Sequence, residues 1–275
     1  MERFYLIVND KKDPKLQEAD RLRTYLLGQG AACKMVRLGQ LKSVPDGTEC
    51  CIVLGGDGSL LQASAYATEK GIPLIGINLG TVGYLTEVEL SSATDALTRL
   101  LDDEFVIEYR MMLQGILRDA KGRETVLNYA LNDVVIARFG AIHLIRLQVY
   151  INDLFLCTYD ADGLIVCTPT GSTGYNMSVG GPVVEPDADL MLMTPIAPLK
   201  MMNRSIVLSS EDRLRIVVDQ THDDIKTMAA VSFDAENVAQ IMPGSEIIIS
   251  RAERETALIR LHDDSFVDVL HKKMN

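Results

Sequence analysis

The stretch Cys51-Ile52-Val53-Leu54-Gly55-Gly56-Asp57-Gly58-Ser59-Leu60-Leu61 decides how the chain is interpreted. Its wholly apolar start is typical of a strand that is buried on both faces of a parallel sheet. The glycines that follow allow backbone conformations and close approaches that a side chain would block. A helix beginning near Ser59 would direct its unpaired N–H groups and the positive end of its dipole into the same turn. Such a turn favours the binding of phosphate.

Asp57 is the residue of this turn that phosphate binding does not explain. A carboxylate repels phosphates unless it binds a metal or takes a proton. We therefore interpret Asp57 as a base or a magnesium anchor in chemistry at a phosphate. The alternative is structural, because a Gly-Gly-Asp-Gly turn also connects a strand to a helix, with Asp57 capping the helix N-terminus. The stretch alone leaves both interpretations open.

Length and composition limit the class of protein. The 275 residues suffice for one large domain or two smaller ones. No apolar run is long enough to cross a bilayer, and charged residues occur early, so we expect a cytoplasmic protein that does not bind membranes. A net charge of -11, from 27 basic and 38 acidic side chains, argues against a general affinity for nucleic acid. It still permits a nucleotide held by glycine amides and magnesium.

The cysteines and histidines show no pattern of a disulfide framework or a metal site. The five cysteines are an odd number, and most lie in apolar runs, so we expect small buried side chains in a reducing compartment. They are Cys33, Cys50, Cys51, Cys157 and Cys167. The four histidines are scattered without ligand spacing, and we predict no structural zinc site.

The first half of the chain alternates between strand and helix patterns, which predicts a parallel sheet with helices on its faces. The predicted strands are Phe4–Val8, Ala32–Val36, Cys50–Leu54 and Pro73–Asn78. The predicted helices run from Leu16 to Leu27, from near Ser59 to about Lys70, and from a cap at Ser91 or Ser92 to Leu101. Ligands of such sheets bind beyond the carboxyl ends of the strands. The turns Gly55–Gly58 and Asn78–Gly83 both lie at that edge.

From about Val106 the apolar segments become short and rich in β-branched residues, which predicts an antiparallel β domain. The predicted strands are Leu113–Leu117, Val126–Leu131, Val134–Ala137, Ile142–Ile151, Leu154–Thr158, Leu164–Cys167, Ile206–Leu208, Leu214–Val218, Ala229–Phe233, Glu246–Ser250 and Ala257–Leu261. The closing segment Phe266–Lys273 fits a short amphipathic helix that returns to the first domain.

A second candidate binding segment lies inside the β-rich half. The strand that starts at Asp160-Ala161-Asp162 leads into Thr168-Pro169-Thr170-Gly171-Ser172-Thr173-Gly174-Tyr175-Asn176-Met177-Ser178, which continues to Pro182. Small hydroxyls and glycines offer many hydrogen-bonding groups with little bulk, which suits a polar ligand held against the backbone. An ordinary surface loop is the alternative.

Together these motifs resemble the NAD kinases, which transfer a phosphoryl group to the 2′-hydroxyl of NAD to make NADP. The similarity covers nearly the whole chain. Its motifs are Gly55–Gly58, Asn78–Gly80 with Gly83–Thr86, Asn132-Asp133, Asp162-Gly163 with the loop to Pro182, Thr194–Pro198 and Asn203-Arg204. The Gly-Gly-Asp-Gly element alone is shared with diacylglycerol and sphingosine kinases and with phosphofructokinases, whereas the long loop is specific to NAD kinases.

The resemblance implies an N-terminal α/β domain followed by an all-β C-terminal sandwich domain, with the active site between them. We place the first domain at residues 1–105, completed by a C-terminal helix at 262–275, and the NAD-binding sandwich at 106–261. ATP is the implied phosphoryl donor, and it carries Mg²⁺ or another divalent metal. The implied partners are NAD and ATP, in a cytoplasmic homo-oligomer that is a dimer or a tetramer.

The resemblance also implies roles for individual residues. Asp57 is the expected catalytic residue, accepting the proton of the ribose 2′-hydroxyl as that oxygen attacks the terminal phosphate. The expected phosphate-binding residues are Gly55, Gly56 and Gly58. Asn132 and Asp133 are expected to hold the adenosine of NAD, while Asp162 and Ala197 are expected near the nicotinamide. Gly58 and Asp234 are also expected near the substrate. The residues expected around the adenine are Tyr84, Thr173, Gly174, Tyr175 and Ser178. Asp162 would reach the nicotinamide from a neighbouring subunit.

The chain departs from the family pattern at a few positions. Ser59 stands where threonine is commoner, Asp133 replaces glutamate, Gly174 replaces alanine, and Leu199–Met202 replaces a histidine-containing segment. Two other functions stay open at this stage, a lipid or sugar kinase that shares the glycine turn and a non-catalytic NAD(P)-binding regulatory homologue. The sequence also leaves open ATP or polyphosphate as donor and NAD or NADH as acceptor.

Overall fold

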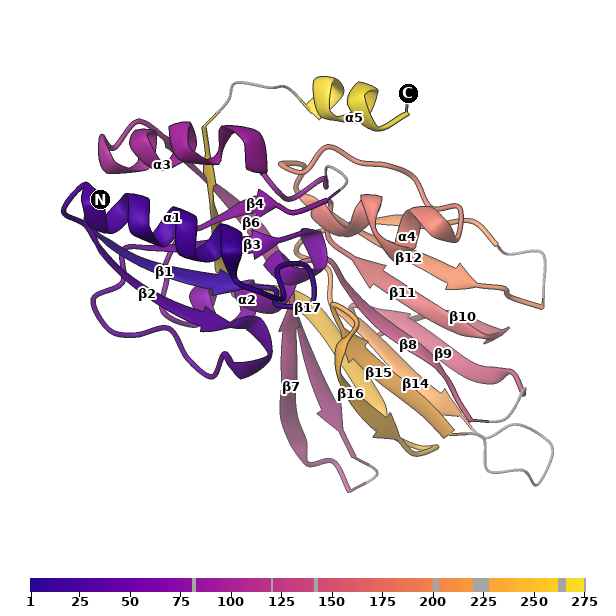
Figure 1. Ribbon diagram of the computed structural model, residues 1–275. Coiled ribbons are helices and arrows are strands. Elements are labelled where there is room, and N and C mark those ends of the chain that lie inside the picture. Colours follow the sequence, from indigo (N-terminus) through magenta and orange to yellow (C-terminus); the bar gives the residue numbers. More distant parts are fainter. Residues whose placement is uncertain are drawn as a thin grey trace. The chain divides into compact units, whose positions relative to one another are not determined.

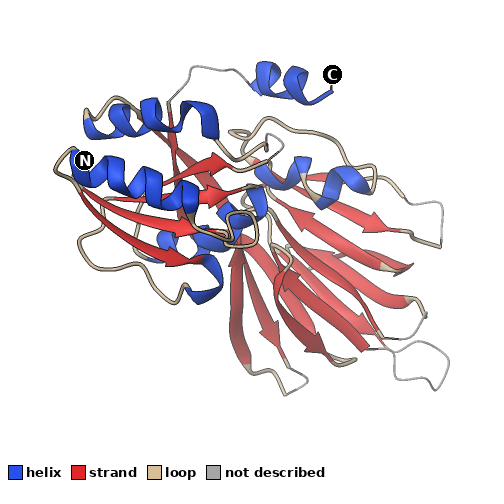
Figure 2. Ribbon diagram, viewed as in Figure 1, coloured by secondary structure: helices blue, strands red, loops and turns tan. Residues whose placement is uncertain are grey.

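The computed structural model describes residues 1–80, 83–119, 121–140, 143–199, 203–219, 228–261 and 266–274 (Figure 1). The chain forms two compact units, unit 1 of Met1–Arg110 with Glu255–Asn275 and unit 2 of Met111–Arg254. The domain boundaries expected from the sequence fall a few residues from these limits. Helices gather in unit 1, while strands dominate unit 2 (Figure 2).

Unit 1 is built on a parallel sheet with the strand order β2-β1-β3-β4. The strands are β1 (Arg3–Val8), β2 (Ala32–Arg37), β3 (Cys50–Gly55) and β4 (Leu74–Asn78), and the short β5 (Val88–Glu89) pairs with β4. The helices are α1 (Gln17–Gly28), α2 (Asp57–Glu69), α3 (Ala93–Leu101) and α5 (Phe266–Met274), with 3-10 turns η1 (Leu38–Gln40) and η2 (Leu90–Ser92). No helix in the described part of the chain is long and apolar enough to span a membrane.

The two faces of the unit 1 sheet are covered by different helices (Figure 1). Phe4, Leu6 and Val8 of β1 belong to one buried cluster with the apolar residues of α1 and α3. On the other face, a Cβ at Gly76 of β4 would lie 2.7 Å from Leu60 Cδ1 of α2, so that helix packs closely there. Helices on both faces leave the carboxyl edge of the sheet as the place for a ligand.

Unit 2 is a sandwich of antiparallel strands. One sheet contains β10-β9-β14-β17, and the other has the order β13-β12-β11-β8-β15-β16. Their buried faces form one apolar core, in which Leu147 and Ile247 of the first sheet join Ile136 and Phe233 of the second. The strands that lie wholly or partly in unit 2 are β6 (Val106–Arg118), β7 (Glu124–Ala130), β8 (Asp133–Phe139), β9 (Ile145–Ile151), β10 (Leu154–Ala161), β11 (Gly163–Cys167), β12 (Leu190–Ile196), β13 (Ile206–Ser209), β14 (Leu214–Asp219), β15 (Met228–Phe233), β16 (Glu236–Ile241) and β17 (Glu246–Arg260). The start of β6 and the end of β17 belong to unit 1.

β12, which contains Pro195, is a strand that the sequence analysis did not predict. Its pairing with β13 runs from Leu190 to Met193 among the described residues. Ile196 directs its C=O toward the N–H of Asp162, so Pro195 faces the opposite side, beyond the end of that pairing. A proline is tolerated in a strand where its missing N–H removes no ladder hydrogen bond.

β17 is one strand, whereas the sequence predicted two, Glu246–Ser250 and Ala257–Leu261. The polar residues between them are part of the strand and include three exposed positions. A strand with one solvated face does not need an apolar residue at each position, so the break in hydrophobicity was not a break in structure. The sequence analysis also missed β5 and β16. Some residues of the predicted elements lie outside the described residues, namely Thr81 and Val82 of the second glycine turn, Ile142, Lys200–Met202, 262–265 and Asn275.

Four of the cysteines are buried and Cys157 is partly buried, as free thiols. Burial raises the pKa of Cys33 to about 11 and that of Cys51 to about 12. These thiols therefore stay protonated near neutral pH and act as small apolar side chains.

Candidate functional site

The glycine turn of unit 1 joins β3 directly to α2. Gly56 is the N-cap in an extended conformation and the helix begins at Asp57, two residues before the expected start. A Cβ at Gly55 would lie 2.3 Å from Ser59 Oγ, so this position requires glycine. Ser59 Oγ accepts a hydrogen bond of 2.8 Å from Asn9 Nδ2 in the loop after β1. The hydroxyl of Ser59 thus holds two loops of the carboxyl edge together.

The carboxylate of Asp57 does not cap its own helix. Its Oδ2 accepts the N–H of Tyr84 at 2.6 Å, and its Oδ1 accepts the N–H groups of Leu85 and Thr86, both at 3.1 Å. The structural alternative, an N-cap formed by Asp57, is therefore wrong. The side chain instead fixes the segment that follows the second glycine turn.

Gly83 is required by this arrangement. A Cβ there would lie 1.7 Å from Asp57 Oδ1, which no rearrangement of that anchored carboxylate could accommodate cheaply. The N–H of Gly83 also donates to Thr86 Oγ1 at 3.2 Å. The sequence-predicted residues Gly55, Gly56, Asp57 and Tyr84 thus come together at one edge, with Gly58 exposed in the first turn of α2.

Lys12 was missed by the sequence analysis, which assigned no role to the residues between the first strand and the first helix. A Cβ at Gly56 would lie 2.7 Å from Lys12 Nζ, and one at Gly80 would lie 3.5 Å from the same atom. The ammonium group therefore lies beside both glycine turns. A signal was present, because a lysine in the loop after a parallel strand lies at the same carboxyl edge as the turns.

In unit 2, Asp234 organises the segment Leu131–Asp133. Asp234 and Ala235 both have positive φ, at 51° and 62°, and Phe233 pairs with Glu236 across them. This is a two-residue hairpin turn of the kind that matches strand twist. The Asp234 carboxylate accepts the N–H of Leu131 at 2.7 Å, of Asn132 at 2.7 Å and of Asp133 at 3.1 Å. The turn thereby positions both predicted adenosine-binding residues.

Asp133 is a buried acid next to a second acid. Burial, helped by the neighbouring charge of Asp234, raises the pKa of Asp133 to about 7. Burial also raises the pKa of Asp234, although its three amide donors oppose that rise. The pair therefore carries a proton over much of the range between pH 4 and 7, and Asp133 is able to donate or accept a hydrogen bond.

The segment Thr168–Pro182 is held mostly by its own polar groups. Thr168 Oγ1 donates to Leu131 O at 2.6 Å and accepts the N–H of Gly171 at 3.0 Å. The buried Asn176 side chain donates to Ser172 O and Pro182 O and accepts the hydroxyl of Thr194 at 2.7 Å. Several hydroxyls of this loop therefore shape the loop and are not available to a ligand.

The residues predicted around an adenine form the accessible part of the same segment. Tyr175 and Ser178 are exposed, while Thr173 and Gly174 are partly buried at the end of η3 (Thr170–Thr173) and the start of α4 (Tyr175–Ser178). A Cβ at Gly174 would lie 3.2 Å from Asn132 Nδ2, so an alanine would press on that side chain. Gly174 thus leaves room beside Asn132.

Asn132 presents an unsatisfied atom at this place. Its Oδ1 is buried and has no hydrogen-bond partner among the described residues. A buried polar atom without a partner is rare in folded proteins and costs free energy unless a ligand or water supplies a donor. Asn132 is therefore an indication of a ligand at this place, beside the residues predicted to surround an adenine.

Asp162 and Ala197 lie beside each other, since the N–H of Asp162 donates to Ile196 O at 3.0 Å. The Asp162 carboxylate accepts a hydrogen bond of 2.7 Å from Arg138 Nε of the same chain. Ala197 is exposed and has a positive φ of 44°, which is uncommon for a residue with a side chain. Among the described contacts these two residues do not touch the cluster of Asn132, Asp133 and Asp234.

Comparisons with known proteins identify the family. Residues 4–105 match the model of the ATP-NAD kinase N-terminal domain, and residues 131–261 match that of the ATP-NAD kinase C-terminal domain. The chain is 40% identical to an NAD kinase of Agathobacter rectalis, over 100% of this chain and 99% of the relative. The chain belongs to the NAD kinase family. An NAD kinase of Lachnospira eligens is 38% identical over the full length of both chains. The resemblance drawn from the motifs is thereby confirmed.

Two solved structures share the fold of this NAD kinase family member. Yeast NADH kinase, crystallised with NADH, aligns with a TM-score of 0.87 and 20% identity over 100% of this chain and 87% of that one. An NAD kinase from Archaeoglobus fulgidus, crystallised with ATP, aligns with a TM-score of 0.80 and 22% identity over 98% of each chain. The predicted fold class, an α/β domain followed by an all-β sandwich, is confirmed.

Proposed function

We propose that this protein transfers a phosphoryl group from ATP to the 2′-hydroxyl of the adenosine ribose of NAD, which makes it a phosphotransferase with an alcohol acceptor. Relatives named NAD kinase that match the full chain support this function. The observation that carries it in the structure is Asp57, an anchored carboxylate at a glycine turn that suits phosphate.

Asp57 is suited to act as the base. An ionised carboxylate has about four acceptor positions, and three of them are occupied by the N–H groups of Tyr84, Leu85 and Thr86. The remaining position, on Oδ2, has a fixed direction because the other three hold the group in place. A hydroxyl is a poor nucleophile unless a base takes its proton as it attacks, and positioning supplies most of the remaining catalysis.

Unit 2 is suited to bind the adenosine. The buried Asn132 Oδ1 would accept a hydrogen bond from an adenosine hydroxyl or amino group, which would satisfy an otherwise unpaired atom. Asp133 lies next along the chain, and the exposed Tyr175 provides a ring for stacking. Thr173, Gly174 and Ser178 would line the adenine, while Asp162 and Ala197 would contact the nicotinamide end.

Magnesium is proposed to enter as MgATP. Mg²⁺ is usually bound through substrate phosphates and one or two carboxylates, so it needs no dedicated protein cage. Its role would be to neutralise charge on the phosphates during transfer. Within the described ranges no group of three or more His, Cys, Asp or Glu could hold a metal ion.

A homo-oligomer and a cytoplasmic location remain parts of the proposal. Asp162 pairs with Arg138 within one chain, and a role at a neighbouring subunit's nicotinamide site would require that pair to be exposed or rearranged. Light scattering of the purified protein, with and without NADP, measures the oligomeric state directly.

The test of function is NADP formation by the pure protein from NAD and MgATP, with NADH and polyphosphate as alternative substrates. Product from NAD and ATP, lost in Asp57→Asn, is the expected result. Tight NADP binding without turnover would instead identify a regulatory homologue. Phosphorylation of a lipid or sugar but not of NAD would overturn the acceptor that we propose.

A further inference from the structure

The loop after β1 fixes the backbone of Lys12 beside the glycine turn. The N–H of Asn9 donates to Leu54 O at 2.9 Å, and the N–H groups of Lys12 and Asp13 both donate to Asn9 O at 3.0 Å. Asn9 Nδ2 reaches Ser59 Oγ in the first turn of α2. Lys12 is therefore part of an ordered turn at the carboxyl edge, although its side chain is exposed.

The ammonium group of Lys12 lies beside two glycines, where no side chain covers the backbone. Added Cβ atoms at Gly56 and Gly80 would lie 2.7 Å and 3.5 Å from Lys12 Nζ. Asn78 Oδ1 accepts the N–H of Gly80 at 3.1 Å and so fixes the second turn. Gly56 is also the N-cap of α2, where the N–H groups of Asp57 and Gly58 have no partner within the helix, whereas that of Ser59 donates to Gly56 O at 2.9 Å. A cation and free amides thus face the same space.

The acids of this region have other partners. The Asp10 carboxylate pairs with Arg37 Nη1 at 3.0 Å, and the Asp13 carboxylate accepts three N–H groups at the start of α1. Asp57 is held by the amides that follow Gly83. In the described part of the chain Lys12 forms no ion pair. In a chain of net charge -11, this makes a local positive site suited to an anion.

We propose that Lys12 binds the polyphosphate chain of the phosphoryl donor, an inference that rests on the proposed function and assigns a further residue to it. The ammonium group has three N–H donors, and each phosphate oxygen is a charged acceptor. The side chain reaches over Gly56 and Gly80, which allow the phosphates to approach both the ammonium and the backbone amides. ATP and inorganic polyphosphate share this chemistry, so the test includes both.

The kinetic experiment compares Lys12→Met, Lys12→Arg and the matched control Lys11→Met in the full chain. Lys11 is the adjacent exposed lysine, whose N–H bonds to Asn9 Oδ1 and is kept in the variant. In Lys12→Met the KM for ATP rises about 10- to 100-fold, the range for a lost charged hydrogen bond. The KM for NAD stays within about threefold, Lys12→Arg recovers most of the loss, and Lys11→Met stays within about twofold of wild type.

A binding experiment separates this proposal from the proposed function. Calorimetry at low salt measures the affinity of the full chain for inorganic tripolyphosphate and for ATP. Weakening of at least about tenfold for both ligands in Lys12→Met, but not in Lys11→Met, supports the proposal even if no NADP is formed. Equal affinities of Lys12→Met and wild type for tripolyphosphate, or an unchanged KM for ATP, would overturn it while leaving the kinase activity in place.

Discussion

Asp57 in unit 1 and Asp234 in unit 2 hold the backbone in the same way and in opposite electrostatic settings. Each carboxylate accepts three consecutive backbone N–H groups, those of Tyr84–Thr86 for Asp57 and those of Leu131–Asp133 for Asp234. The first acid belongs to an edge that carries a lysine and a helix N-terminus. The second lies beside a buried acid with a raised pKa.

The same arrangement, a carboxylate that accepts three consecutive backbone N–H groups, therefore serves two different purposes. At Asp57 the amides fix the direction of a charged group that we expect to act on substrate. At Asp234 they stabilise a turn whose main consequence is the position of Asn132 and Asp133. A carboxylate held by amides is therefore not evidence of catalysis by itself, and the surrounding charges and glycines decide which use applies.

Asp57→Asn is the variant with the largest expected effect. The asparagine amide cannot take the proton of the hydroxyl, and its NH2 group cannot accept the backbone N–H groups that Asp57 holds. We therefore expect kcat to fall by at least about 100-fold, as is usual for loss of a general base. Steady-state NADP formation measures kcat, and calorimetry with NADP measures binding, which should change less than about fivefold. Asp102→Asn, at an exposed acid of the same unit, is the matched control. A kcat of Asp57→Asn within threefold of wild type would mean that Asp57, like Asp234, only holds the backbone and does not act as a base.

Gly83→Ala tests whether the amide clamp on Asp57 matters for turnover. The added Cβ would overlap Asp57 Oδ1, so the carboxylate or the segment after Gly83 must move. A shift of about 1 Å at a reacting group costs up to about 100-fold in rate, and we expect kcat to fall by about 10- to 100-fold with the fold retained. Circular dichroism checks the fold. Gly39→Ala, where a Cβ meets open space, should keep full activity. Full activity of Gly83→Ala would show that the clamp is dispensable.

The sequence could predict β1 to β4 and the helices of unit 1, but not the two-residue β5, because the longer elements have apolar patterns that end at glycines or polar residues. Through the family motifs it could also place Asn132, Asp133 and Asp234 near the same substrate, which stays a prediction, and the structure joins the three residues by hydrogen bonds. It could not show that the Asp57 carboxylate contacts Tyr84–Thr86, because that contact joins segments from different parts of the chain. Lys12 was missed for a similar reason, since its proximity to Gly56 and Gly80 exists only once β1, β3 and β4 are side by side.

Asp133→Asn tests whether the acid next to Asp234 is buried in a setting that raises its pKa. A carboxyl whose pKa is about 7 in the folded chain and about 3.9 when unfolded binds more protons in the folded state between these values. Its contribution to stability is therefore complete below about pH 4 and is lost as the pH rises to about 7. Between pH 5 and 8 we expect the free energy of unfolding of Asp133→Asn, measured with urea, to rise by about 2.5 kcal/mol relative to that of wild type. The control Asp187→Asn, at an exposed acid, should leave the pH dependence of the free energy of unfolding unchanged. If Asp133→Asn and wild type showed the same pH dependence, the raised pKa of Asp133 would be contradicted.

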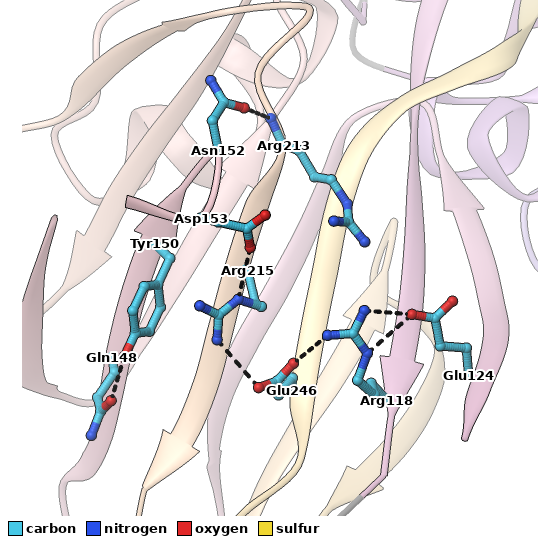
Figure 3. A network of polar contacts seen from close by, with 9 residues as sticks. All are labelled: Arg118, Glu124, Gln148, Tyr150, Asn152, Asp153, Arg213, Arg215 and Glu246. Atoms are coloured by element: carbon cyan, nitrogen blue, oxygen red, sulfur yellow. Dashed lines mark hydrogen bonds and ion pairs between the residues drawn. The ribbon is translucent and has the colours of Figure 1, made fainter. Parts of the chain in front are cut away.

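A substitution at Glu246 has the smallest expected effect on stability. The carboxylate of Glu246 pairs with two arginine side chains (Figure 3), whereas those of Asp57 and Asp234 bind backbone N–H groups. Its two oxygens contact Arg118 Nη1 at 2.9 Å and Arg215 Nη1 at 3.2 Å. Arg118 also pairs with Glu124, while Arg215 pairs with Asp153 and stacks on Tyr150 at 3.8 Å. In Glu246→Gln both arginines therefore keep a partner.

Such partly exposed ion pairs contribute up to about 1 kcal/mol and are screened by salt. We expect Glu246→Gln to lower the free energy of unfolding by about 0.5–1 kcal/mol at low salt, less in 0.5 M NaCl, with KM and kcat unchanged. A loss above about 3 kcal/mol, or a change in the KM for NAD, would mean that this arginine network supports the binding site. In that case Glu246, which pairs with arginines, would matter for the binding site of unit 2 as Asp234 does, which holds backbone N–H groups.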